Sequence, residues 1–386
     1  MMKDPTKKPR RFGFLDGVRG LTASYIVFNH ATLNIVLHDK AHAMSAGVRS
    51  IAGLLKNGLL AVQIFIVLSG FCLMLAAMGD GGRLRGGLQG FAVRRAARIL
   101  PCYYGTLVFA LCMIALVPGI TALDASNRVT IPGLLAHLVM LHNFSPAWIL
   151  QIDPPMWSLC IEWQIYFIFA LILLPIWQRL GTVAALLTGI GIGVGIHVVT
   201  KGFADYSQPF YIGFFAMGMA GAAISVGTSE FSNRARKLPW TAIGVVFLIA
   251  CGLIFRFDRS AHAWIISTNF LSLSVAALLT AQMSARPDGF NLRRLLEWKP
   301  VDALGRISYS LYLAHYPVLA VLYSMIHRWR LSPDAELGIM LAVGVPASLA
   351  VASVFYKFFE KPFLGGFGVL RARVRVQEIV PVAVAD

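Results

Sequence analysis

The chain has 386 residues, of which 57% are hydrophobic and only 13% are charged. A soluble domain carries about 25% charged residues, so this composition excludes an ordinary soluble protein and indicates a membrane protein. Apolar segments of about 20 residues predict helices rather than the roughly 10-residue alternating strands of an outer-membrane barrel. The net charge of +16 is scattered over the loops, where it sets topology and meets anionic lipid headgroups, so no nucleic-acid partner is expected.

The hydrophobic pattern predicts an all-α, polytopic membrane bundle of about ten spanning helices. The predicted spans are 17–38, 58–78, 99–118, 157–177, 182–200, 207–226, 239–257, 262–283, 304–327 and 336–359. The connections at 177–182 and 257–262 require tight turns. The stretch 132–145 is too short to span and predicts an interfacial or re-entrant helix.

Loop charges predict that both termini are cytoplasmic, because Lys and Arg concentrate in the N-terminal run and in alternate loops. We expect a single membrane domain over residues 1–386, with a transmembrane core at about 14–363 and a short basic cytoplasmic tail at about 364–386. No small-residue cleavage site follows a short apolar core, so no cleavable signal peptide is expected. Five cysteines lie in or beside apolar segments without metal-ligand spacing, which predicts buried thiols, no disulfide and no metal site: Cys72, Cys102, Cys112, Cys160 and Cys251.

The first apolar segment contains two ionisable residues, Arg19 and His30. They are 11 positions apart, so on a helix they share one face and lie about 16 Å apart along its axis. Asp16 suits the N-cap of this helix. Ionisable groups within a membrane span are a functional-site hypothesis by default. The alternative is a snorkelling arginine and a buried histidine that bonds a neighbouring helix.

Two further segments combine small or basic residues with apolar ones. Ser69 and Gly70 interrupt the second span, where they permit close approach of another helix. Arg95 and Arg98 are three residues apart and share a helix face near the start of the third span, where Pro101 is tolerated. Two such arginines can grip phosphate groups, but they also fit a simple topology signal.

The fourth span brings Trp157 and Glu162 into an apolar run, and the predicted topology puts Glu162 toward the extracytoplasmic side. A carboxylate there needs a partner, such as an arginine or the His30 imidazole, in a functional or a purely structural pair. In the ninth span, Tyr312 and His315 face the same way. An aromatic belt explains the tyrosine better than the histidine.

These stretches together resemble the acyltransferase 3 family of membrane O-acyltransferases. Four motifs of the family occur here in the family's order. They are LDGVRG with Arg19 and His30, the Ser69-Gly70-Phe71 run, Arg95 and Arg98 before Pro101, and Trp157-Ser158-Leu159 followed by Glu162. YSLYLAHYP and FFEKPF resemble its closing motifs, so the resemblance extends from residue 14 to about 363. Departures are mild: Val18 replaces a leucine, and Ile64 precedes Phe65 where two phenylalanines are common.

The resemblance implies transfer of an acyl group, most often acetyl, from acyl-coenzyme A to a hydroxyl of a carbohydrate or glycoside, in the inner membrane of a bacterium. Coenzyme A thioesters enter as donor substrate, and no permanently bound cofactor is expected. We expect His30, Arg19 and Glu162 to be catalytic and Arg95 and Arg98 to hold the donor. His30 is expected either to take the acceptor proton or first to carry the acyl group.

Ser69, Trp157, Tyr312 and His315 are expected to contact substrate. Some relatives carry a fused hydrolase-like domain; without one, the membrane domain would complete the transfer alone or with a partner. Two other classes stay open: a transporter, since intramembrane charges also mark transport paths, and a non-catalytic component of polysaccharide export. Membrane lipids are the other expected partners.

Overall fold

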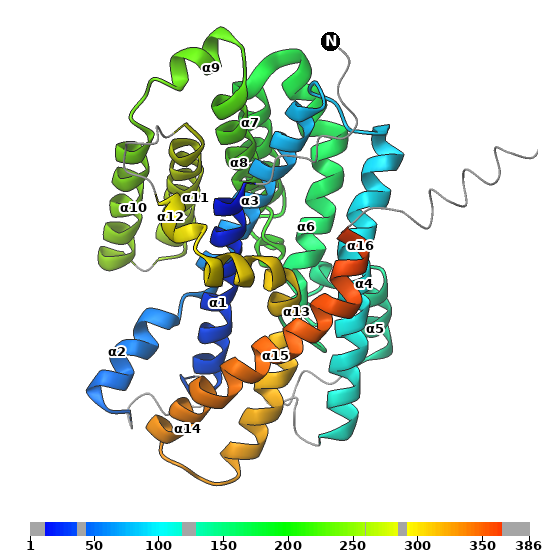
Figure 1. Ribbon diagram of the computed structural model, residues 1–386, viewed down its shortest axis with the longest axis vertical. Coiled ribbons are helices and arrows are strands. Elements are labelled where there is room, and N and C mark those ends of the chain that lie inside the picture. The colour runs from blue at the N-terminus through cyan, green and yellow to red at the C-terminus, as the bar shows by residue number, and fades with distance from the viewer. Residues whose placement is uncertain (1–11, 37–43, 118–128, 259, 285–291, 365–386) are drawn as a thin grey trace, which may run out of the picture.

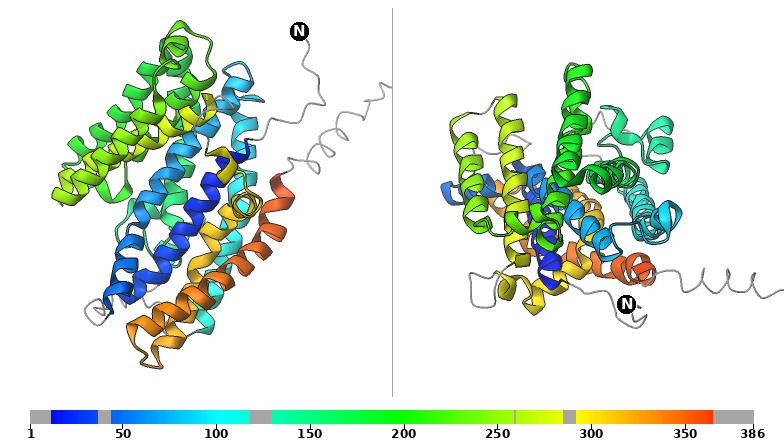
Figure 2. Two further views of the ribbon diagram at one scale, coloured as in Figure 1. Left: turned by 60° about the vertical axis from the view of Figure 1, so that its left-hand side comes forward. Right: turned by 90° about the horizontal axis from the view of Figure 1, so that it is seen from above.

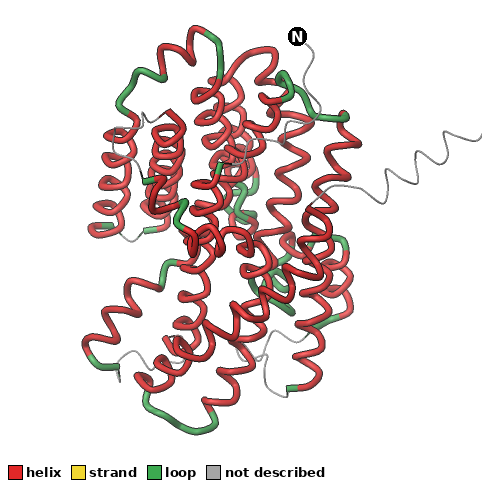
Figure 3. Tube along the Cα trace, in the orientation of Figure 1, coloured by secondary structure: helices red, strands yellow, loops and turns green. Residues whose placement is uncertain are grey.

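The computed structural model describes residues 12–36, 44–117, 129–258, 260–284 and 292–364. All regular structure in these ranges is helical, with no strand, which confirms the prediction of an all-α bundle (Figure 3). The basic N-terminal run and nearly all of the predicted tail lie outside the described residues. The cytoplasmic location of both termini therefore stays a prediction.

Long helices run up and down through the molecule (Figure 1). They are α1 (Gly13–Ile35), α3 (Gly58–Gly79), α4 (Gly87–Leu116), α6 (Met156–Ile168), α7 (Leu174–Val199), α8 (Tyr211–Val226), α10 (Trp240–Phe257), α11 (Ala261–Ser284), α13 (Lys299–His327) and α15 (Val345–Phe355). Short helices connect them: α2 (Ala46–Leu55), α5 (Ile131–Leu138), α9 (Glu230–Ala235), α12 (Arg293–Leu296), α14 (Pro333–Ile339) and α16 (Lys361–Leu364). Single turns of other helix types complete the list: η3 (His142–Phe144), η4 (Phe169–Leu173), η5 (Asp205–Ser207), η6 (Met340–Gly344) and η7 (Tyr356–Glu360).

Eight segments of the described chain are long and apolar enough to cross a membrane. One of them, Met156–Val199, contains α6, η4 and α7, and its backbone breaks at Gly181, where φ is 85°. This break lies at the predicted turn between residues 177 and 182. α1 is not among the eight, because Arg19, Asn29 and His30 lower its hydropathy. The count of about ten spans therefore stays a prediction.

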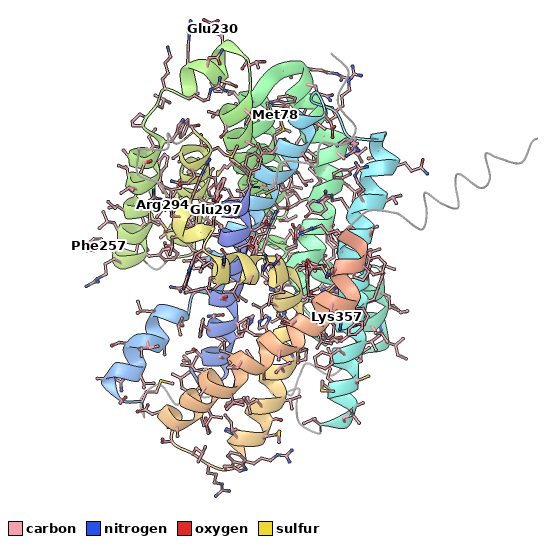
Figure 4. The ribbon with its side chains drawn as sticks, viewed as in Figure 1. Met78, Glu230, Phe257, Arg294, Glu297 and Lys357 are labelled. Carbon is pink, nitrogen blue, oxygen red and sulfur yellow. The ribbon has the colours of Figure 1, made fainter. Side chains whose placement is uncertain are left out.

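Helix α1 begins earlier than the sequence suggested, at Gly13, so Asp16 lies in its first turn and is not the N-cap. The N–H of Phe14 donates to Glu297 Oε1 at 3.2 Å, which satisfies one of the free N–H groups of the first turn. Glu297 extends from α12 beside this helix start (Figure 4). Asp16 still favours the helix there, because its negative charge meets the positive end of the helix dipole.

Helix α1 packs along α13 with almost no space between the two backbones. A Cβ atom on Gly305 would lie 2.2 Å from the carbonyl oxygen of Asp16. Only glycine permits this approach, which brings the later part of α1 directly against the middle of α13. Figure 2 shows the two helices next to each other from a second direction.

Helix α4 also begins earlier than predicted, at Gly87 rather than near residue 99. Gly86 precedes it with a φ of 66°, a left-handed conformation that glycine adopts without strain. Pro101 therefore lies inside the helix rather than near its start. Arg95, Arg98 and Pro101 all belong to the continuous helix α4, so Arg95 and Arg98, three residues apart, lie on the same face of that helix.

The core between α3, α4, α6 and α8 is filled by aromatic and aliphatic side chains, among them Phe71, Tyr103, Phe169 and Phe215. Helices α10 and α11 form a pair at the side of this core, and α10 exposes much of its apolar surface, as expected of a lipid-facing helix (Figures 1 and 2). All five cysteines are free thiols in the structure. Cys112 is exposed and Cys72 is half-buried, so the prediction of burial is wrong for these two thiols.

Candidate active site

His30 lies in the last quarter of α1 and contacts a second histidine on α13. Its Nδ1 is 2.7 Å from His315 Nε2, and the two rings are nearly parallel, with centroids 5.0 Å apart. His315 is fully buried, and its Nδ1 lies 2.9 Å from the carbonyl oxygen of Leu311. The sequence led us to expect that the Glu162 carboxylate would pair with an arginine or with the His30 imidazole; in the structure the hydrogen-bond partner of His30 is His315.

Two tyrosines stand beside the histidine pair. The ring of Tyr316 meets that of His30 edge to face, with centroids 5.4 Å apart. No described residue makes a hydrogen bond with the Tyr316 hydroxyl, although the residue is 94% buried. Tyr312 lies within 2.6 Å of Ser158 Oγ and donates to the carbonyl oxygen of Pro155 at 3.1 Å. Tyr312 thus fixes the start of α6 against α13, whereas the Tyr316 hydroxyl can still serve a ligand.

Glu162 of α6 forms a polar cluster with the second span. The hydroxyls of Ser69 and Tyr166 donate to Glu162 Oε1 at 2.7 Å and 2.5 Å. Arg95 is close enough to Glu162 for their charges to interact. Met156 at the start of α6 is fully buried, and Glu162 lies within electrostatic range of Arg95.

Ser69 and Gly70 each have a definite partner in the structure. Ser69 holds Glu162, as described above. A Cβ atom on Gly70 would lie 2.0 Å from the carbonyl oxygen of Phe215, so Gly70 lets α3 and α8 touch through their backbones. The packing function that the sequence indicated for this pair of residues is therefore correct for Gly70. The serine contacts the candidate site.

Arg19 points from α1 toward α3. Its Nη1 pairs with Asp16 Oδ1 at 3.0 Å, and its Nη2 donates to Cys72 Sγ at 3.1 Å. About a quarter of the side chain remains exposed. The guanidinium is therefore oriented by one carboxylate and one thiol but retains N–H groups that can reach a ligand.

Arg95 and Arg98 have no hydrogen-bond partner among the residues that the structure describes. The Arg95 guanidinium lies 5.7 Å from the centroids of Phe91 and Tyr166, and its Nε is buried without a partner. Arg98 lies near enough to Glu360 for electrostatic attraction. Two half-buried guanidiniums without hydrogen bonds are suited to bind an anion, because each has five N–H donors to satisfy.

Glu360 was missed as a site residue, although its motif, FFEKPF, contributed to the resemblance. Its side chain is 3% exposed, and Oε2 accepts from both the backbone N–H and the hydroxyl of Ser310, at 3.2 Å and 2.7 Å. Its charge also acts on Arg19 and Arg98. A glutamate directly after the last predicted span, 336–359, was the available signal, because a carboxylate that is buried at the end of an apolar helix requires partners.

The segment before α6 returns deep into the bundle. The hydroxyls of Tyr103 and Tyr104, in the middle of α4, donate to carbonyl oxygens of His137 and Leu138 in α5. The ring of His137 stacks on that of His142 with centroids 3.7 Å apart, and both residues are fully buried. Burial lowers the pKa of both imidazoles, so both are neutral.

Asp153, at the end of this segment, is a second residue that sequence reasoning missed. Its side chain is fully buried, and neither carboxylate oxygen has a hydrogen-bond partner among the described residues. Burial raises the pKa of the Asp153 carboxyl well above its usual range. The carboxyl is close enough to interact electrostatically with Tyr312 and Tyr316. The available signal in the sequence was an acidic residue directly before two prolines, Pro154 and Pro155.

Trp157 is half-buried in the first turn of α6, and its ring contacts that of Tyr211 at a centroid distance of 6.0 Å. Of the four residues predicted to contact substrate, Ser69 and Tyr312 use their hydroxyls within the protein, and His315 bonds His30. Trp157 is the one that keeps a partly exposed aromatic surface.

Comparison with known proteins finds one family model and several relatives that match nearly the whole chain. A family model described as "Acyltransferase domain" matches residues 12–357. YrhL of Bacillus subtilis (strain 168), provisionally named a peptidoglycan O-acetyltransferase, is 27% identical over 416 residues, which cover 98% of this chain and 59% of YrhL. The O-acetyltransferase OatA of Staphylococcus aureus (strain NCTC 8325 / PS 47) is 22% identical over 381 residues, which cover 92% of this chain and 57% of OatA.

The chain therefore spans less than two thirds of the length of these relatives. No solved structure matches it.

Proposed function

Because the chain belongs to the acyltransferase 3 family of membrane O-acyltransferases, we propose that it moves an acyl group from acyl-coenzyme A to a carbohydrate hydroxyl. The names of its relatives favour acetyl as the acyl group and a cell-wall glycan such as peptidoglycan as the acceptor. A bacterial inner membrane is the proposed location, with the donor on the cytoplasmic side.

One observation supports this proposal above the others: the residues of the family motifs come from six helical elements, α1, α3, α4, α6, α13 and η7, and meet inside one bundle. α1 contacts α13 through His30 and His315, and α3 contacts α6 through Ser69 and Glu162. A purely structural bundle would avoid so many buried polar groups, because each is costly in an apolar surrounding. A concentration of this kind is typical of an active site.

His30 acts as the general base in this proposal. It takes the proton of the acceptor hydroxyl as that oxygen attacks the thioester carbon, forming a C–O bond and breaking the C–S bond. The proton then passes to the departing thiolate of coenzyme A. In the variant with an acyl-enzyme, the imidazole attacks the thioester first and the acceptor oxygen displaces it in a second step. Tyr316, with its hydroxyl available beside His30, donates a hydrogen bond to the developing oxyanion.

Arg19, Arg95 and Arg98 bind the donor. Arg19 is about 16 Å from His30 along α1, too far to stabilise an oxyanion formed at the imidazole, so we assign it to the donor phosphates. Arg95 and Arg98 supply N–H groups that lack partners within the described chain. Glu162 and Glu360 orient these arginines and limit the positive charge that is buried without a ligand.

The acceptor binds beside the pair of His30 and His315, on the side where the segment before α6 lies. A sugar ring can stack on the exposed part of Trp157, because aromatic faces pack well on the apolar face of a ring. The neutral Asp153 carboxyl, which has no partner among the described residues, can exchange hydrogen bonds with sugar hydroxyls.

The decisive experiment is transfer of radiolabel from acetyl-coenzyme A to extracted cell-wall glycan by protein in nanodiscs. Wild type is compared with His30→Ala and with His197→Ala, a matched control whose imidazole bonds Asp205 outside the site. We expect label on glycan with wild type and the control only. Equal transfer by all three folded proteins would contradict the catalytic role of His30. No transfer by wild type, together with glycan flux into proteoliposomes, would favour a transporter.

A further inference from the structure

The two ring nitrogens of His315 have different partners, and this difference determines where the protons lie. Nδ1 lies 2.9 Å from the carbonyl oxygen of Leu311, one turn earlier in α13. A carbonyl oxygen can only accept a hydrogen bond, so Nδ1 carries the hydrogen atom. In a neutral imidazole the other nitrogen, Nε2, then holds a lone pair and must accept.

The atom that donates to His315 Nε2 is His30 Nδ1, 2.7 Å away. His30 therefore carries its hydrogen on Nδ1, and its own Nε2 keeps a free lone pair. The backbone of α13 thus determines the tautomer of a side chain on α1. The packing of α1 along α13 holds the two rings beside each other.

We propose that His315 is a positioning residue, which holds His30 in the Nδ1–H tautomer so that Nε2 is the atom that takes the acceptor proton. This inference rests on the proposed function. When Nε2 of His30 takes that proton, the ring becomes an imidazolium, and its Nδ1–H bond to His315 becomes charge-assisted and stronger. An interaction that strengthens during the reaction stabilises the transition state more than the ground state.

Two variants of similar volume separate this role from simple packing. In His315→Gln, the side-chain oxygen can accept from His30 Nδ1–H while the amide donates to Leu311, which reproduces both hydrogen bonds. In His315→Leu neither bond is possible. We expect His315→Leu to lower kcat about 100-fold or more with KM within about threefold, in line with the usual contribution of general base catalysis, and His315→Gln to remain within about tenfold of wild type.

A second measurement does not depend on acetyl transfer. In protein labelled with ¹⁵N-histidine, the chemical shifts of His30, assigned by their absence from the spectrum of His30→Ala, report which nitrogen is protonated. We expect Nδ1–H in wild type and in His315→Gln, and a growing share of Nε2–H in His315→Leu.

Equal loss of kcat in the two His315 variants at the same thermal midpoint, or Nε2–H at His30 in wild type, would overturn the inference. Full activity of His30→Ala would instead contradict the proposed function, and the spectra would still report the tautomer. The two failures are therefore distinguishable.

Discussion

Replacing Gly70 by alanine should weaken the site although no polar side chain is substituted. The added Cβ atom would lie 2.0 Å from the carbonyl oxygen of Phe215, whereas ordinary contact begins at 3.4 Å. Helices α3 and α8 must therefore separate by about 1.4 Å, or α3 must rotate. The opposite face of the contact cannot give way, because a Cβ atom on Gly218 of α8 would itself lie 1.9 Å from Val67 O.

The size of the effect follows from the residue next to Gly70. Ser69 donates to Glu162 over 2.7 Å, so a shift of about 1.4 Å would break this hydrogen bond. Overpacking costs about 1–3 kcal/mol of stability, and a hydrogen bond to a charged group contributes about 1.5–3 kcal/mol. If half of the second contribution acts in the transition state, kcat/KM falls roughly 3- to 15-fold, and it falls up to about 150-fold if all of it does.

Acetyl transfer and thermal unfolding of Gly70→Ala in nanodiscs measure both effects. Gly252→Ala is the matched control, since a Cβ atom on this glycine inside α10 would meet no atom within 4 Å. We expect the control to match wild type in rate and in thermal midpoint. A Gly70→Ala protein that is as active and as stable as Gly252→Ala would show that the contact between α3 and α8 tolerates the added methyl group.

Three further predictions concern single side chains. Tyr316→Phe should lower kcat about 100- to 1000-fold with little change in KM, as loss of one oxyanion donor does elsewhere, measured by steady-state transfer. Arg95→Gln should raise the KM for acetyl-coenzyme A at least tenfold while the KM for glycan stays constant, because a phosphate contact is lost. Asp153→Asn should remove a pH dependence of stability. Burial raises the pKa of the Asp153 carboxyl in the folded protein. Below about pH 4 the carboxyl is protonated in both the folded and the unfolded state, so the free energy of unfolding of wild type is then highest. Above that pH the free energy of unfolding falls by up to about 1.4 kcal/mol per pH unit until the folded-state pKa is passed.

Each of these has a result that would contradict it. Unchanged kcat in Tyr316→Phe would remove the tyrosine from the reaction. A rise in the KM for glycan alone would move Arg95 to the acceptor side. Parallel unfolding curves of wild type and Asp153→Asn between pH 4 and pH 8 would show that the carboxyl is solvated.

The sequence alone predicted the helices well, because their signal is local. Each of the ten predicted ranges overlaps a helix of the structure, and the turn near residue 180 lies at Gly181. Helix starts were less accurate: Asp16 and Pro101 both lie inside helices, since capping by Glu297 and the left-handed Gly86 extend α1 and α4 toward their N-termini. Such tertiary contacts leave no trace in hydrophobic periodicity.

The candidate residues were found, but their partners were not. His30 was one of two partners expected for Glu162, the other being an arginine, whereas the structure pairs His30 with His315, 285 positions away in the sequence. Glu162 bonds Ser69, which had been assigned to packing or substrate. Asp153 and Glu360 gained significance only when their burial was known. Residue type and depth in a span can be read from one helix, but a contact between helices depends on their rotation and register.

Under the proposed roles, the continuous helix between Arg19 and His30 sets the distance that the donor must span from its phosphates to its thioester. Eleven residues of α-helix fix about 16 Å between the group that holds phosphate and the group that does chemistry, and a helix cannot stretch to suit a different molecule. Selection then depends on the length between phosphate and thioester rather than on the acyl chain. Donors with a truncated pantetheine arm would bind and leave their carbonyl short of His30, acting as competitive inhibitors of the enzyme.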